Sequence, residues 1–205
     1  MNSTQNPGDI PPKIVLRIVM LGSYGVGKTS FLVRHFDEKF PRFGAIGLDQ
    51  RLHIEERDGK QCKFQVWDLV VGNFRHSQPT PQYYKSANGI LIFVDLSSDI
   101  CMRAQLNHWM SEIEKKASDN VCRLLVGTKC DLPQLISDEE FEEFASMYNM
   151  PCIKTSSKDN TNLSEAMQLM MDAVYRQSKN FNFTSQPMHV NAKVGPALKS
   201  KSCFI

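Results

Sequence analysis

The residues best suited to chemistry form one segment near the start of the chain, Gly22-Ser23-Tyr24-Gly25-Val26-Gly27-Lys28-Thr29. It matches the pattern GxxxxGK[ST], whose glycines let successive backbone N–H groups point at phosphate oxygens. We expect Lys28 to reach the terminal phosphates and the Thr29 hydroxyl to ligate Mg²⁺. The residues predicted to contact a phosphorylated nucleotide here are Ser23, Tyr24, Gly25, Val26, Gly27, Lys28, Thr29 and Ser30.

The elements around this segment have the order that a phosphate site needs. The apolar run Ile14–Leu21 predicts a buried strand before it, and a helix is predicted to begin over Thr29–Phe36. The positive end of that helix would then face the phosphates. This context favours a phosphate cradle over a glycine-rich turn that carries a lysine by chance.

The rest of the chain alternates strand-like and helix-like segments. Arg51–Glu56 and Gln61–Trp67 flank Asp58-Gly59, a strong hairpin signal. Further strands are predicted at Ile90–Val94, Arg123–Gly127 and Cys152–Thr155, and further helices around Leu106–Ile113, Asp138–Tyr148 and Leu163–Val174. This order predicts an α/β fold, a three-layer sandwich of the P-loop NTPase type. Its six-stranded sheet would be mostly parallel, with one antiparallel edge strand.

Length and composition limit the classes of protein. The 205 residues suffice for one domain, predicted at 13–178 between a flexible leader (1–12) and a flexible tail (179–205). A net charge of +2 argues against a nucleic-acid partner. No apolar run has the length of a membrane span, and the polar start is unlike a secretory signal. Six cysteines without metal-ligand spacing indicate unpaired thiols in a reducing, cytoplasmic compartment.

Two later loops point to the base of the nucleotide. Thr128-Lys129-Cys130-Asp131 and Thr155-Ser156-Ser157-Lys158 each follow a predicted strand, so both should lie at the carboxyl edge of the sheet. With Ile46–Asp49, Lys63–Asp68 and Tyr83–Ala87, they make the chain resemble the Ras-superfamily small GTPases, nearest to the Rab branch. The resemblance covers about residues 13–178.

The resemblance implies binding of GTP or GDP with Mg²⁺, and a function in vesicle trafficking or signalling. Asp131 would accept hydrogen bonds from guanine that adenine cannot donate, and Thr29 and Asp68 would hold the metal. Effector and exchange proteins would bind through the switch surface. The residues expected around the base are Phe40, Thr128, Lys129, Asp131, Leu132, Ser156, Ser157 and Lys158.

Several positions depart from the family pattern. Thr128 replaces the family's asparagine, so we expect guanine preference with weakened affinity. Ala45 stands where the family has a switch threonine that ligates Mg²⁺. After Asp68 the chain carries an extra residue, Val71, so that Gly72 falls one position late and Asn73 is the nearest substitute for the catalytic glutamine. Because phosphoryl transfer depends on positioning, these changes predict impaired hydrolysis and leave no catalytic residue to assign.

Three further features leave alternatives open. Tyr24 replaces a small residue. Its ring would either block the arginine finger of an activating protein, contact the γ-phosphate, or point into solvent without a role. Pro79 and Pro81 are expected to interrupt the usual switch helix. Cys203 is third from the end, unlike a CaaX box, so membrane contact is expected only if this cysteine is lipidated. We therefore expect a cytoplasmic protein, peripheral on endomembranes in the lipidated case.

Three functions remain in competition. The first is a Rab-like switch that hydrolyses GTP slowly or not at all. The second is a pseudo-GTPase scaffold that holds nucleotide structurally without switching. The third is an unrelated P-loop ATPase or kinase, against which Lys129 and Asp131 argue because they suit guanine.

Overall fold

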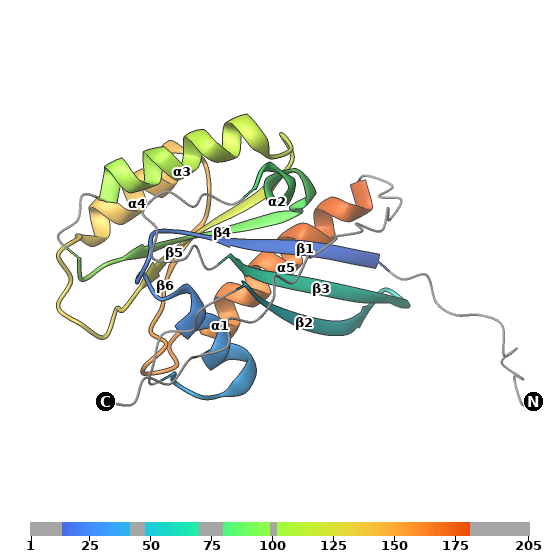
Figure 1. Cartoon of the computed structure of the whole chain (residues 1–205), viewed down its shortest axis with the longest axis horizontal. Helices are drawn as coiled ribbons and strands as arrows, with labels where there is room; N and C mark the ends of the chain where they lie inside the picture. Colours follow the sequence, from blue (N-terminus) through green and yellow to red (C-terminus); the bar gives the residue numbers. More distant parts are fainter. Residues whose placement is uncertain (1–13, 42–47, 70–79, 99–101, 181–205) are drawn as a thin grey trace, which may run out of the picture.

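A computed structural model describes residues 14–41, 48–69, 80–98 and 102–180. Within these ranges the chain forms a six-stranded sheet of order β2-β3-β1-β4-β5-β6 (Figure 1). The strands are β1 (Ile14–Leu21), β2 (Leu48–Arg57), β3 (Lys60–Leu69), β4 (Gly89–Asp95), β5 (Cys122–Thr128) and β6 (Cys152–Lys154). The pair β2 and β3 is antiparallel and every other pair is parallel, which confirms the predicted sheet with its antiparallel edge strand.

Helices cover both faces of the sheet, so the predicted three-layer arrangement is also confirmed. They are α1 (Lys28–Asp37), α2 (Pro81–Ser86), α3 (Met102–Lys116), α4 (Asp138–Met147) and α5 (Leu163–Asn180). Residues of α1 and α5 pack in one buried cluster, and residues of α2, α3 and α4 pack in the other. In Figure 1, α3 and α4 lie above the strands, α1 lies below them, and α5 passes behind them.

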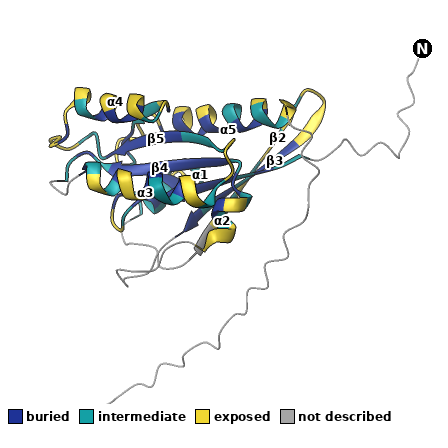
Figure 2. Cartoon of the chain, turned by 90° about the horizontal axis from the view of Figure 1, so that it is seen from above, coloured by how far each residue is buried: buried dark blue, intermediate teal, exposed yellow. Residues whose placement is uncertain are grey.

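The strands in the middle of the sheet are apolar on both faces because both are covered. Along β1, Ile18 and Met20 enter the cluster with α5, while Val19 and Leu21 enter the one with α3. All residues of β4 from Gly89 to Val94 are buried. Figure 2 shows the buried strands between helices whose outer sides are exposed. This packing holds the carboxyl ends of β1, β3, β4 and β5 in fixed relation.

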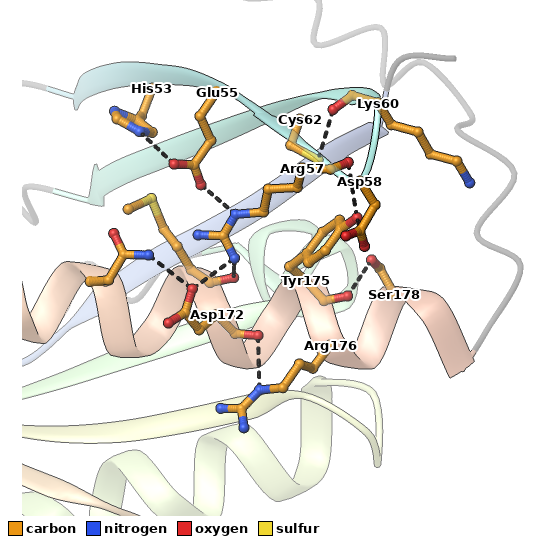
Figure 3. Close-up of polar contacts among 12 residues, drawn as sticks. His53, Glu55, Arg57, Asp58, Lys60, Cys62, Asp172, Tyr175, Arg176 and Ser178 are labelled. Atoms are coloured by element: carbon orange, nitrogen blue, oxygen red, sulfur yellow. Dashed lines mark hydrogen bonds and ion pairs between the residues drawn. The ribbon is translucent and has the colours of Figure 1, made fainter. Parts of the chain in front are cut away.

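The hairpin of β2 and β3 is tied to α5 by a polar cluster at its turn (Figure 3). The guanidinium of Arg57 pairs with Glu55 at 2.5 Å and with Asp172 at 2.7 Å, and it lies 5.2 Å from the ring centroid of Tyr175. The Tyr175 hydroxyl donates to the Asp58 carboxylate at 2.9 Å. Burial and the neighbouring Asp58 raise the pKa of Tyr175 to about 12, so the phenol remains protonated and keeps this bond.

Most predicted boundaries agree with the structure to within a few residues. The last helix extends to Asn180, past the predicted domain end at 178, and β6 ends one residue earlier than expected, at Lys154. Pro81 is the first residue of α2, where proline loses no helical hydrogen bond, whereas Pro79 lies outside the described residues. Among the described helices, none combines the length and the apolar character that crossing a bilayer requires.

Candidate nucleotide-binding site

The predicted phosphate loop leaves β1 through a glycine that no other residue could replace without strain. Gly22 has φ 147°, and an added Cβ would lie 2.7 Å from the carbonyl oxygen of Phe93. Five residues on, Gly27 caps the N-terminus of α1 with φ 100°. These backbone conformations favour glycine, and they fold the intervening segment into a tight turn before the helix. The expected order of strand, loop and helix is confirmed.

Lys28 lies beneath this loop and is only 8% exposed. Its ammonium donates to the carbonyl oxygen of Gly22 at 2.7 Å and to that of Ser23 at 2.9 Å. Burial lowers the pKa of Lys28 to about 8, although the negative charge of Asp68 acts in the opposite direction. The loop therefore holds a partly desolvated cation whose charge is not fully compensated, which suits an anionic ligand.

This lowered pKa predicts how nucleotide binding depends on pH. Phosphate anions stabilise the charged amine and raise its pKa, so binding above pH 8 requires uptake of a proton. GDP affinity should be constant from pH 6.5 to 7.5 and about fourfold weaker at pH 8.5. The measurement is a fluorescence titration with labelled GDP, stopped at pH 8.5 to limit ionisation of the base itself. An affinity that does not change up to pH 8.5 would contradict the lowered pKa of Lys28.

The predicted metal ligands are brought together across the sheet. Thr29 is the second residue of α1, and its hydroxyl donates to Oδ2 of Asp68 at 2.5 Å. Asp68, near the end of β3, is fully buried. Hydroxyl and carboxylate oxygens are the hard ligands that Mg²⁺ prefers, and this metal commonly takes few protein ligands beside phosphates and waters. The donor set thus fits Mg²⁺.

A cavity of about 190 Å³ opens beside the phosphate loop. It is lined by Gly27, Ser30, Phe40, Thr128, Lys129, Asp131, Leu132, Ser157 and Lys158. Every residue predicted around the base is among them except Ser156. Phe40 is 48% exposed, so its ring can offer an apolar face to a planar base.

Ser156 has a different position from the one predicted. It is fully buried, and its hydroxyl donates to Oδ1 of Asp131 at 2.6 Å. Lys158 Nζ lies 3.8 Å from Oδ2 of the same carboxylate. The Ser156 hydroxyl therefore limits the rotation of the carboxylate that is predicted to read guanine, and Lys158 adds positive charge beside it.

Lys129 lines the cavity and also pairs with a carboxylate at the end of β4. Its backbone has φ 58°, which is uncommon outside glycine, and its ammonium donates to Oδ2 of Asp95 at 2.6 Å. Burial acts to raise the pKa of Asp95, but hydrogen bonds from Lys129 and Ser97 outweigh it and hold that pKa below its usual value. Asp95 was not predicted as part of the site, although its place directly after the apolar run Ile90–Val94 was a usable signal.

Thr128 lines the cavity, and its hydroxyl contacts two backbone carbonyl groups. Its hydroxyl lies 2.6 Å from the carbonyl oxygen of Val26 and 3.0 Å from that of Val94. The residue is 3% exposed. Thr128 is expected to contact the base less than the family's asparagine does. Its hydroxyl instead joins the phosphate loop to the ends of β4 and β5.

Removing this hydroxyl should weaken both the fold and the site. In Thr128→Val the two carbonyls lose their buried donor, which should cost about 1–2 kcal/mol of unfolding free energy. We expect GDP to bind several-fold more weakly, because the phosphate loop would no longer be held by β5. Denaturant unfolding and GDP titration measure the two effects, with Thr128→Ser as the matched control that keeps the hydroxyl. Equal stability of the Val and Ser variants would contradict this assignment.

The remaining loop residues are divided between solvent and interior. Tyr24 is 74% exposed, Gly25 is exposed with φ 80°, and Val26 is buried. The Ser23 hydroxyl donates to Oε1 of Gln105 on α3 at 2.7 Å. No sequence signal marked Gln105, because a helical glutamine is an ordinary surface residue.

The divergent switch positions lie outside the described residues. These are Ala45, Val71, Gly72 and Asn73, and the tail cysteine Cys203 lies outside them as well. The predictions made for them, and those for the leader and the tail, rest on the sequence alone.

Comparisons with known proteins agree with this geometry. The Ras family model matches residues 17–176. The Ras-related protein RABD2c of Arabidopsis thaliana is 33% identical over 92% of this chain and 95% of its own length. The GTP-binding protein ypt1 of Schizosaccharomyces pombe is 32% identical over 88% and 90%, and human Ras-related protein Rab-3A is 30% identical over 91% and 86%. Matches of this extent show that the chain belongs to the Ras family, as a Rab-like member of the Ras superfamily of small GTPases.

Proposed function

We propose that this chain is a guanine-nucleotide-binding protein of the Rab type whose intrinsic GTP hydrolysis is weak or absent. One observation carries the proposal. The phosphate loop and the two predicted guanine loops, which follow it by about 100 and about 130 residues, line one cavity at the carboxyl edge of the sheet. Relatives named Ras-related and GTP-binding proteins support the guanine nucleotide as ligand.

Guanine recognition is assigned to Asp131. Its carboxylate lines the cavity, and its side chain is 7% exposed. The Ser156 hydroxyl already occupies one side of Oδ1, which limits the rotation of the group. A carboxylate held in this way can accept from the N1–H and exocyclic amino group of guanine, whereas adenine presents a lone pair at the matching ring nitrogen. Phe40 is placed to contact the face of the base.

The phosphates are assigned to Lys28 and the backbone of the loop. Mg²⁺ would be held by Thr29 and Asp68, and when bound it supplies charge neutralisation at the phosphate oxygens. Lys28 contributes a second positive charge from beneath, since its ammonium already lies under the loop. Binding and orienting the nucleotide are therefore the tasks that these residues can perform.

Weak hydrolysis is proposed from the sequence of the switches. Ala45 has no oxygen for the metal, and the extra residue before Gly72 moves Asn73 out of the position of the family's glutamine. Since most of the catalysis in phosphoryl transfer comes from positioning, each change should slow the reaction. The alternative of an unrelated P-loop ATPase or kinase loses its support through membership in the Ras family.

The experiment that tests this function has two stages. Purified protein is first titrated with fluorescent GDP, GTP and ATP analogues, with and without Mg²⁺. Single-turnover hydrolysis of bound GTP is then followed beside human Rab-3A under identical conditions. We expect tight guanine binding, weak adenine binding, and hydrolysis at least about tenfold slower than in Rab-3A. Ala45→Thr restores the hydroxyl that the family has at this position, so this variant should hydrolyse GTP faster than the wild type.

Each result decides one part of the proposal. Failure to bind guanine nucleotides would refute the binding function, and hydrolysis at the rate of Rab-3A would refute the catalytic defect. Binding without any hydrolysis, together with equal partner binding in the GDP and GTP forms, would favour the pseudo-GTPase scaffold.

We further propose a place for the protein in membrane trafficking, with effector and exchange proteins bound at the switch surface. The similarity to Rab-type relatives supports this proposal. Attachment to endomembranes would then depend on lipidation of Cys203. Intact-mass measurement of the protein purified from its own cells tests this, because an isoprenoid adds a defined mass and an unmodified cysteine does not.

A further inference from the structure

The phosphate loop contacts both strands and a helix. Gly22 packs against the backbone of β4, and the Val26 carbonyl accepts from Thr128 at the end of β5. The contact to a helix is the hydrogen bond that the Ser23 hydroxyl donates to Oε1 of Gln105 on α3, at 2.7 Å. Strands inside a covered sheet are held on both sides by hydrogen bonds, whereas α3 can shift as a unit against the sheet.

Ser23 has two tasks in this arrangement. Its side chain is bonded to α3, and its carbonyl oxygen accepts from the Lys28 ammonium at 2.9 Å. The next residues, Tyr24 and Gly25, are exposed, and open space surrounds the position of a Cβ on Gly25. Gln105 therefore restrains the Ser23 peptide, whose carbonyl oxygen is one of the two that hold the Lys28 ammonium.

A second cavity lies between the loop and α3, with a volume of about 100 Å³. It is lined by Ser23, Tyr24, Gly25, Val26, Val94, Asp95, Ser98, Met102 and Gln105. The loop is thus not tightly packed on this side, and the hydrogen bond spans the space between the two walls. A loop beside a cavity can change its shape at lower cost than one packed on apolar side chains.

Helix α3 is in turn packed against α2. Tyr84 of α2 is fully buried in the same cluster as Leu106 and Met110 of α3. Lys116 of α3 also lies over the Tyr84 ring, 5.4 Å from its centroid. A continuous path of contacts therefore leads from α2 through α3 and Gln105 to the phosphate loop.

We infer that Gln105 is a positioning residue for the nucleotide: by accepting the hydrogen bond of Ser23 it holds the phosphate loop in its binding shape and slows nucleotide release. This inference rests on the proposed guanine-nucleotide function. It assigns to α3 a direct influence on how long the nucleotide stays bound.

The test measures the release of fluorescent GDP after addition of excess unlabelled GDP. Gln105→Leu and Ser23→Ala should each speed release about fivefold, the effect of losing one partly buried hydrogen bond. The double variant should release GDP no faster than either single variant, since both remove the same bond. Ser23→Thr keeps the hydroxyl and should release GDP more slowly than Ser23→Ala does.

The matched control on the same helix is Asn107→Leu. It also removes a helical amide and a hydrogen bond, the one from Tyr148 at 3.1 Å, but that bond leads to α4 and not to the phosphate loop. Release should be unchanged in this variant. Equal acceleration by Asn107→Leu would mean a general loosening of α3 and would overturn the inference.

The remaining outcomes are equally decisive. Release at the wild-type rate in both Gln105→Leu and Ser23→Ala, from a protein that binds GDP, overturns the inference while the proposed function stands. Absence of GDP binding by the wild type overturns the proposed function, and this inference with it. Effects of the single variants that simply add in the double variant would show that the two side chains act separately.

Discussion

Replacing Lys28 with methionine is expected to weaken GDP binding by about a hundredfold or more. The ammonium would donate charge-assisted hydrogen bonds to phosphate oxygens, each contributing roughly 1.5–3 kcal/mol. Methionine keeps most of the side-chain volume beneath the loop and removes only the charge and the donors. Titration with fluorescent GDP measures the loss. Lys115→Met, at an exposed position of α3, removes the same charge elsewhere and should bind GDP normally.

The same variant should stabilise the nucleotide-free protein. The pKa of Lys28 is about 8, against 10.5 for an ordinary lysine. Below pH 8 the buried ammonium is charged, and its desolvation lowers the free energy of unfolding by roughly 3 kcal/mol, partly offset by the carbonyl contacts. Between pH 8 and 10.5 the unfolded chain binds the extra proton, so wild-type stability rises with pH across that window and the advantage of the variant shrinks. Melting curves of nucleotide-free protein at pH 7 and pH 9.5 measure this change. A variant less stable than wild type at pH 7 would contradict it.

Asp131→Asn is the second substitution with a large expected effect. The amide presents a donor where guanine needs an acceptor, so about a hundredfold loss of GDP affinity follows from the hydrogen bonds to a charged group. Xanthosine diphosphate has a carbonyl in place of the exocyclic amino group, and it should bind the variant more tightly than GDP does. Titration with both nucleotides tests this reversal of preference.

Asp119→Asn is the matched control, because Asp119 is exposed and lies just before β5, at the edge of the sheet opposite the cavity. It should leave the affinity for GDP unchanged. If Asp131→Asn kept the wild-type preference for GDP, guanine would have to be read by another residue of the cavity.

The sequence by itself determined the fold and the chemistry of the phosphate site. Apolar runs of strand length, such as Ile90–Val94, and the helical spacing of Leu106, Trp109, Met110 and Ile113 depend on local periodicity, which secondary structure preserves. The phosphate loop could also be predicted, because its turn requires glycine backbone conformations at fixed positions in the sequence. Asp131 and Phe40 could be assigned since a known family carries the same residues at matching positions.

What the tertiary structure decided were the partners of these residues. Ser156 bonds to Asp131, Thr128 joins the phosphate loop to two strands, and Lys129 pairs with Asp95. Gln105 enters the site although it is 82 residues from Ser23 in sequence. A hydrogen bond between such distant residues depends on how helices and strands pack, and it leaves no periodic pattern in the chain. The sequence therefore determined which chemical groups are present, and only the packing of the layers decided which of them meet.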